Sequence, residues 1–169
     1  MKTLANKMLQ TARSKRWLAV TWLCAVLTLS VHAGALSVGD AVPAFSAKDQ
    51  FGKEFKFAAC LHFLLLGFDM GASKAANLKL ADLGPGWLEK QGAAYLADIH
   101  TMPAIARVFA LPKMRKYPHR IILGDDEHLL APFPRQPDRI TVLVLAADGK
   151  IKEIRYWNPA NEALATRLN

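Results

Sequence analysis

The residues best placed to do chemistry lie in one short turn between an apolar run and an expected helix. The turn carries a thioether at Met70, a hydroxyl at Ser73 and an ammonium at Lys74, with Gly71 between them. The first N–H groups of a helix have no partner within it, so they attract anions. With Lys74 alongside, the turn could hold a carboxylate or a phosphate. Alternatively, Ser73 caps the helix and Lys74 is a solvated surface charge.

Thiol chemistry would have to use Cys60. The only other cysteine, Cys24, lies in an expected leader segment, so Cys60 has no partner for a disulfide within the remaining chain. Cys60 precedes the apolar run at residues 61–66, and free cysteine is among the most buried residue types. We therefore expect an inert, buried thiol. The alternative is a reactive thiol that works with an external thiol partner.

Imidazoles and carboxylates gather in the sequence around residues 119–128. A divalent ion could bind there, but the spacing of the candidates matches no established ligand pattern: His119, Asp125, Asp126, Glu127 and His128. The chain also has no P-loop, no G-x-G-x-x-G and no G-x-S-x-G motif. We therefore predict no metal site, no cofactor and no catalytic residue of the hydrolase or nucleotide-binding classes.

The first 35 residues predict a signal peptide. Five basic residues and no acidic residue lie in this segment, the apolar run spans residues 17–31, and Ala33-Gly34-Ala35 is a small-x-small cleavage motif. A largely apolar run of fifteen residues is short for a bilayer-spanning helix, which needs ~20. We expect cleavage after Ala35 and export to the periplasm. The alternative is an uncleaved anchor, which would be the chain's only contact with the membrane.

The basic balance of the chain comes largely from this leader. The sequence has 22 Lys and Arg and 14 Asp and Glu, and five of the basic residues but none of the acidic ones precede residue 36. Residues 36–169 therefore carry a net charge of +3, and nucleic-acid binding loses its main support. These 134 residues are enough for one domain with its own core.

The elements that must position the turn alternate between strands and helices. The apolar patterns predict a hairpin at 44–57, strands at 61–68, 93–99, 119–124, 140–145 and 151–156, and helices at 73–83, 101–111 and 158–169. Thr101 is expected to cap the second helix and Pro112 to end it. An early strand–helix–strand order followed by a late strand hairpin indicates an α/β fold with a mixed sheet.

Aromatic residues and prolines near the carboxyl end predict a surface that contacts a protein or a peptide. Phe133 and Pro134 lie in a proline-rich stretch beside arginines, and Tyr156 and Trp157 follow a predicted strand. The chemistry of the partner does not follow from these residues.

Three segments, in this order, resemble the thioredoxin superfamily. The strings V-G-D-A-V-P-A-F at 38–45 and D-Q-F-G-K at 49–53 are similar to the entry of thiol reductases and peroxiredoxins, and residues 142–151 resemble their final hairpin. The resemblance implies a three-layer thioredoxin-like sandwich over residues 36–169, with a mixed central sheet and an N-terminal hairpin. It places the family's cysteine pair at Met70 and Ser73, and its late-strand proline at Ile140, so the thiols and the proline are missing.

These departures imply a thioredoxin-like scaffold that has lost its redox site. The insertion at 113–138, with Lys116-Tyr117-Pro118, is similar to exported YtfJ-like proteins, a group without an assigned activity. We therefore expect a non-redox binding or accessory module for a periplasmic protein or a small anionic ligand. The expected site consists of Met70, Gly71, Ser73, Lys74 and Ile140. The alternative is a thiol oxidoreductase or a peroxiredoxin-like enzyme that uses Cys60 with an external thiol partner.

Overall fold

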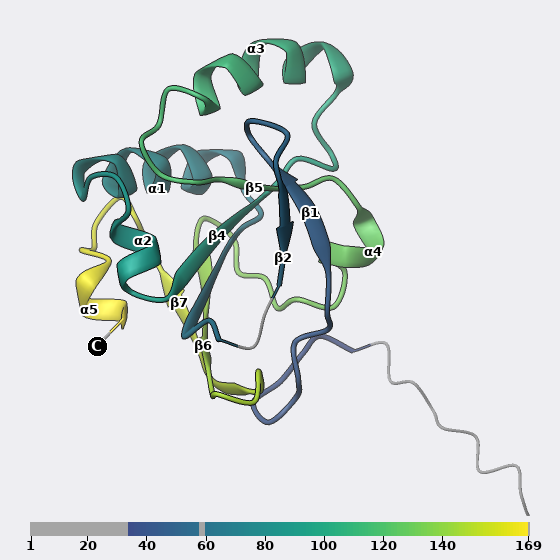
Figure 1. Ribbon diagram of the computed structural model, residues 1–169, viewed down its shortest axis with the longest axis vertical. Helices are drawn as coiled ribbons and strands as arrows, with labels where there is room; N and C mark the ends of the chain where they lie inside the picture. The colour runs from purple at the N-terminus through teal and green to yellow at the C-terminus, as the bar shows by residue number, and fades with distance from the viewer. Residues whose placement is uncertain (1–33, 58–59, 169) are drawn as a thin grey trace, which may run out of the picture. The chain divides into compact units, whose positions relative to one another are not determined.

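A seven-stranded mixed sheet runs through the middle of the protein (Figure 1). The computed structural model describes residues 34–57 and 60–168, so the predicted signal peptide lies outside the described residues except for its last two positions. The strands are β1 (Ser46–Asp49), β2 (Glu54–Lys56), β3 (Phe63–Gly67), β4 (Ala93–Asp98), β5 (Ile122–Gly124), β6 (Ile140–Leu145) and β7 (Ile151–Trp157). Their order in the sheet is β2-β1-β5-β4-β3-β6-β7, which confirms the predicted mixed sheet.

The central strands are parallel and the outer strands are antiparallel to their neighbours. β4 pairs in parallel with both β3 and β5, whereas β6 runs antiparallel to β3, and Gly67 lies opposite Ile140 in that pair. β3 and β6 are buried on both faces, which explains why their sequences are continuous apolar runs. The carboxyl ends of β3, β4 and β5 therefore meet the start of β6 at one edge of the sheet, where ligands bind in open α/β sheets.

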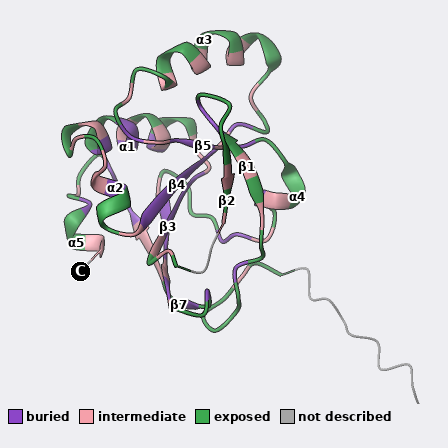
Figure 2. Cartoon of the chain, viewed as in Figure 1, coloured by how far each residue is buried: buried purple, intermediate pink, exposed green. Residues whose placement is uncertain are grey.

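Helices and loops cover both faces of the sheet. The helices are α1 (Met70–Asp82), α2 (Trp87–Lys90), α3 (Ala104–Met114), α4 (Glu127–Leu130) and α5 (Ala165–Leu168). Leu80 of α1 and Leu88 of α2 belong to a core cluster on one face, together with Tyr95 and Trp157. Leu130 of α4 belongs to a second cluster on the other face, which also includes Val42 from residues 36–45, the N-terminal lead that precedes β1. Figure 2 shows the buried residues concentrated on the central strands between these layers.

The helix boundaries differ from the predicted ones for local reasons. α1 begins at Met70, three residues early, because Asp69 supplies the capping carboxylate. Pro103, not Thr101, occupies the capping position of α3, and Pro112 lies inside that helix near its end. The short helices α2 and α4 have too few residues to show a periodic apolar pattern. The predicted C-terminal helix is confined to Ala165–Leu168.

Candidate functional site

The turn at the start of α1 is capped by an aspartate. Asp69 is extended, and its Oδ1 accepts a hydrogen bond from the Ala72 N–H at 2.8 Å. The prediction that Ser73 caps the helix is therefore wrong: Ser73 is the fourth residue of α1 and donates its own N–H to the Asp69 carbonyl. Because the Asp69 carboxylate already compensates the positive end of the helix, a second small anion at this turn would meet a like charge.

The five predicted site residues separate into an exposed group and a buried pair. Met70, at 70% exposure, lies on the surface of α1 with Gly71 and Lys74. Ser73 is half-buried and Ile140 is fully buried. The structure therefore presents a thioether, an ammonium and a glycine backbone to solvent, whereas the Ser73 hydroxyl faces inward.

Gly67, at the end of β3, brings the buried pair together. A Cβ added at Gly67 would lie 2.5 Å from Ser73 Oγ, 2.8 Å from Tyr95 Oη and 3.3 Å from Ile140 Cδ1. The space that a side chain would fill is thus occupied by groups from α1, β4 and β6. The missing Cβ of one strand residue sets how closely α1 can approach the sheet.

A buried polar network continues inward from this contact. Asn77 Nδ2 donates to the Ser73 carbonyl at 2.9 Å, so the Asn77 carbonyl oxygen faces His119 Nε2, also at 2.9 Å. An amide oxygen can only accept, so Nε2 carries the imidazole proton and Nδ1 is a bare acceptor. No sequence pattern pointed to Asn77 or Tyr95, because neither lies near His119 in the chain.

Two atoms of this network are buried without a satisfactory hydrogen bond. Among the described residues, Tyr95 Oη and His119 Nδ1 have no partner of suitable geometry. Burial raises the pKa of Tyr95 to about 12, and the neighbouring Ser73 hydroxyl offsets only part of that rise. Burial lowers the pKa of His119 to about 4. Both groups are therefore neutral near pH 7.

The described residues do not form the metal site that the 119–128 segment could have supplied. His119 is buried against α1, whereas the acidic residues that follow β5 are exposed. Asp125 pairs with Arg107 at 2.6 Å, and Asp126 Oδ1 accepts from the His128 N–H to cap α4. Among residues 34–57 and 60–168, no group of three His, Cys, Asp or Glu side chains is placed to hold a metal ion.

Cys60 is exposed, so the expectation of a buried thiol is wrong. β3 begins only at Phe63, and Cys60 therefore precedes the buried part of the apolar run. It lines a cavity of about 300 Å³ with residues that include Leu88 and Arg120. Leu61 also lines this cavity and directly precedes β3, so the cavity lies at the end of β3 opposite the α1 turn.

We expect the exposed Cys60 thiol to react in the folded protein. A chain of residues 34–169, which lacks Cys24, should be labelled by the disulfide reagent DTNB in buffer as fast as in denaturant, within about threefold. Cys60→Ser should remove the label completely. Labelling that requires denaturant would contradict the exposed position.

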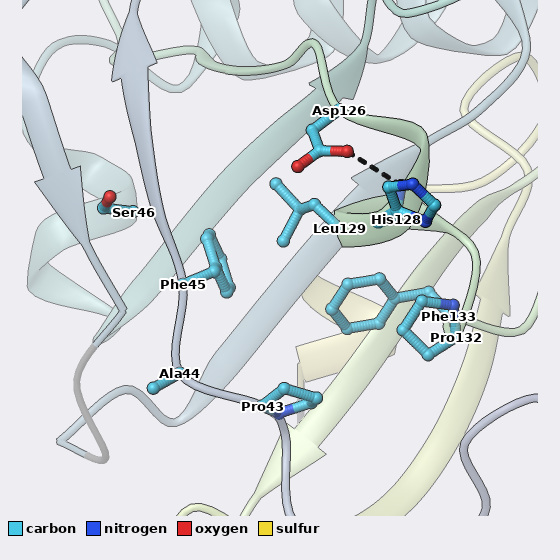
Figure 3. Close-up of a pocket in the computed structure, with 9 residues that line it drawn as sticks. All are labelled: Pro43, Ala44, Phe45, Ser46, Asp126, His128, Leu129, Pro132 and Phe133. Atoms are coloured by element: carbon cyan, nitrogen blue, oxygen red, sulfur yellow. Dashed lines mark hydrogen bonds between the residues drawn. The ribbon is translucent and has the colours of Figure 1, made fainter. Parts of the chain in front are cut away.

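A second cavity, of about 390 Å³, lies between the N-terminal lead and α4. Figure 3 shows Phe45, Leu129 and Phe133 around it, with Asp126 and His128 at one side. Phe133 and Pro134 are buried, and Trp157 is fully buried and donates its Nε1–H to the Glu162 carbonyl. The predicted aromatic contact surface is therefore wrong at these residues, which belong to the interior.

The fold and the strand-to-helix turn define this chain as an α/β protein with a thioredoxin-like fold. Peroxidoxin BcpB from Mycobacterium tuberculosis superposes with a TM-score of 0.51 at 18% identity, over 78% of this chain and 96% of that chain. A protein assigned as the thiol:disulfide interchange protein DsbE of Chlorobium tepidum superposes with a TM-score of 0.53 at 14% identity, over 79% and 96%. PrxQ from Xylella fastidiosa has a TM-score of 0.51 at 13% identity, over 73% and 87%.

At these identities the likeness establishes the fold alone. No protein-family model matches this sequence, and no curated protein matches it either. Within the described part of the chain, no helix has both the length and the apolar character needed to cross a membrane.

Proposed function

We propose that this chain is an exported binding or accessory module, related to the YtfJ-like proteins, that uses a thioredoxin-like fold without thiol chemistry at the α1 turn. The observation that carries the proposal is the chemistry of Met70 and Ser73, which lie about one helical turn apart at the start of α1. Met70 is the first helical residue and has no proton to lose, and the Ser73 hydroxyl is turned towards Gly67 and Tyr95. Disulfide exchange needs a thiolate that attacks and a second thiol that resolves, so this turn cannot perform it.

The ligand that fits this turn best is a segment of a periplasmic protein with an acidic residue beside an apolar one. Met70 offers an exposed apolar contact, and Lys74 offers a charge one turn further along α1. A small free anion is the weaker candidate, because it would have no apolar contact to offset repulsion from Asp69. Export rests on the signal-like residues 1–35.

Charge reversal at Lys74 tests this site. Residues 34–169 would be immobilised, exposed to a periplasmic extract and analysed by mass spectrometry for both proteins and small ligands. Lys74→Glu should weaken capture of the specific partner by about tenfold, since it turns an attractive contact into a repulsive one. Lys79→Glu, also exposed on α1, is the matched control and should capture normally. Equal capture by wild type and by Lys74→Glu would exclude this site.

The second candidate function is an enzyme that works through Cys60, and the exposure of this thiol favours it. Such an enzyme would attack a disulfide or a peroxide with Cys60 and would be reduced again by an external thiol. Insulin reduction and peroxide consumption, each with glutathione present, would be compared between wild type and Cys60→Ser. Under the binding proposal the two proteins perform alike, at the background rate. If either reaction is faster with wild type than with Cys60→Ser, the binding proposal is wrong and the protein is an enzyme that uses Cys60.

A further inference from the structure

Helix α3 presents an apolar side to solvent and contributes no buried residue. Ile105 is 69% exposed, Val108 63% and Phe109 65%, and Pro112 is exposed as well. These residues recur at the spacing of one helical face, so their side chains form a continuous stripe. Figure 2 shows α3 as exposed and partly buried residues only, with none of the buried colour seen on the central strands.

Polar contacts hold the opposite side of α3 to the domain. Arg107 donates to the carbonyls of Ile99 and Met102 at 2.9 Å and pairs with Asp125 at 2.6 Å. Arg115, directly after the helix, donates to the Gln50 carbonyl at 2.9 Å. An isolated helix of 11 residues is marginal in water, so these anchors stabilise α3 while its apolar stripe faces away from the core.

The hydrogen bond from Arg115 to Gln50 brings the turn between β1 and β2 close to the end of α3. Phe51 follows Gln50 in the turn between β1 and β2 and is 63% exposed. Figure 1 shows this turn directly below α3. Four of the eight exposed large hydrophobic residues of the described chain therefore lie on two neighbouring elements: Phe51, Ile105, Val108 and Phe109. Together with Pro112 we call them the α3 ridge.

Lysines border the α3 ridge, whereas the arginine within α3, Arg107, is already paired with Asp125. Lys53, Lys113 and Lys116 are exposed, and no ion pair to them is present among the described residues. An apolar helical face bordered by lysines is typical of elements that lie in the headgroup region of an anionic bilayer.

We propose that the α3 ridge binds the surface of an anionic membrane. Phe51, Ile105 and Phe109 would enter the boundary between headgroups and acyl chains, and the lysines would contact lipid phosphates. A fluid bilayer can adapt to a convex apolar face, and neither cavity described above is lined by an α3 residue. A second copy would bring two lysine-bordered faces together, so charge disfavours self-association there.

Vesicle sedimentation tests this proposal with residues 34–169, which form a compact unit containing both core clusters. The vesicles contain about two parts phosphatidylcholine to one part phosphatidylglycerol, compared with phosphatidylcholine alone. Wild type should bind the anionic vesicles at least tenfold more tightly, and salt should weaken that binding. The double variants Ile105→Ser/Phe109→Ser and Lys113→Glu/Lys116→Glu should each lose about tenfold or more in affinity.

Two further variants separate lipid binding from other effects. Phe51→Ser, which leaves α3 unaltered, should also weaken binding, and this result would exclude misfolding of α3 as the cause. Leu78→Ser/Lys79→Glu alters another exposed apolar and basic pair, on α1, and should bind like wild type. Equal binding to both vesicle types, absence of vesicle binding, or a wild-type dimer that Ile105→Ser/Phe109→Ser dissociates would overturn the proposal.

Discussion

Lowering the pH from 7 towards 4 is expected to reduce the free energy of unfolding by about 2–3 kcal/mol through His119 alone. Burial lowers the pKa of this imidazole from 6.5 to about 4 in the folded protein. Below pH 6.5 the unfolded chain therefore binds a proton at His119 that the folded protein does not bind. The stability is complete above pH 6.5, falls as the pH decreases, and stops falling once the folded protein is also protonated near pH 4.

Urea unfolding at a series of pH values would measure this effect. His119→Gln keeps an N–H donor for Asn77 but does not titrate, so its stability should be nearly flat between pH 6.5 and about 5. His128→Gln, at an exposed site, is the control and should keep the wild-type slope. A wild-type protein without a slope in this range, or one whose slope survives in His119→Gln, would contradict the buried neutral imidazole.

Between pH 6.5 and about 5, the effect of His119 on stability can be distinguished from that of the carboxylates. The pKa of Asp49 is lowered from 3.8 because hydrogen bonds from Lys53 and Phe51 and the Arg120 side chain outweigh the opposing effect of burial. A carboxyl group whose pKa is lowered on folding stabilises the protein above its unfolded pKa, and this stability is lost at lower pH. The loss of stability that comes from protonating Asp49 therefore begins at a lower pH than the loss that comes from protonating His119.

Replacing Gly67 with alanine should cost about 2–3 kcal/mol of stability, although the change adds only one methyl group. The new Cβ would be 2.5 Å from Ser73 Oγ and 2.8 Å from Tyr95 Oη. The serine hydroxyl can rotate, but Tyr95 is fully buried between α1 and the sheet, so relief requires that the helix shift. Denaturant unfolding monitored by circular dichroism would measure the loss.

A double-mutant cycle identifies the cause of this loss. Tyr95→Phe removes the hydroxyl that would collide, so Gly67→Ala should cost at least 1 kcal/mol less in that background. Tyr95→Phe alone should be neutral or stabilising, because the buried hydroxyl that it removes has no hydrogen bond of suitable geometry. Gly34→Ala is the control, since a Cβ there meets nothing within 4 Å. Additive effects of the two changes would show that a collision with the Tyr95 hydroxyl is not the cause of the loss.

Local sequence patterns predicted the scaffold because the apolar pattern that defines a strand or a helix lies within one short segment of the chain. The apolar runs of β3, β4 and β6 have to be buried on both faces, and this requirement alone indicated central strands of an α/β sheet. The position of the turn was predicted in the same way, from a strand at 61–68 and a helix at 73–83, although α1 begins earlier, at Met70. The absence of thiols at Met70 and Ser73 is a property of the chain itself, independent of any fold.

Tertiary structure alone decided how the site residues are arranged. Whether Cys60 is buried depends on where β3 begins, and the buried network depends on α1 bringing Asn77 to His119, 42 residues along the chain. The exposed side of α3 has the same apolar spacing as a helix face that packs in a core. The periodicity of a sequence indicates that one face of a helix is apolar. What covers that face depends on where the other elements lie, because burial is a contact between segments distant in sequence.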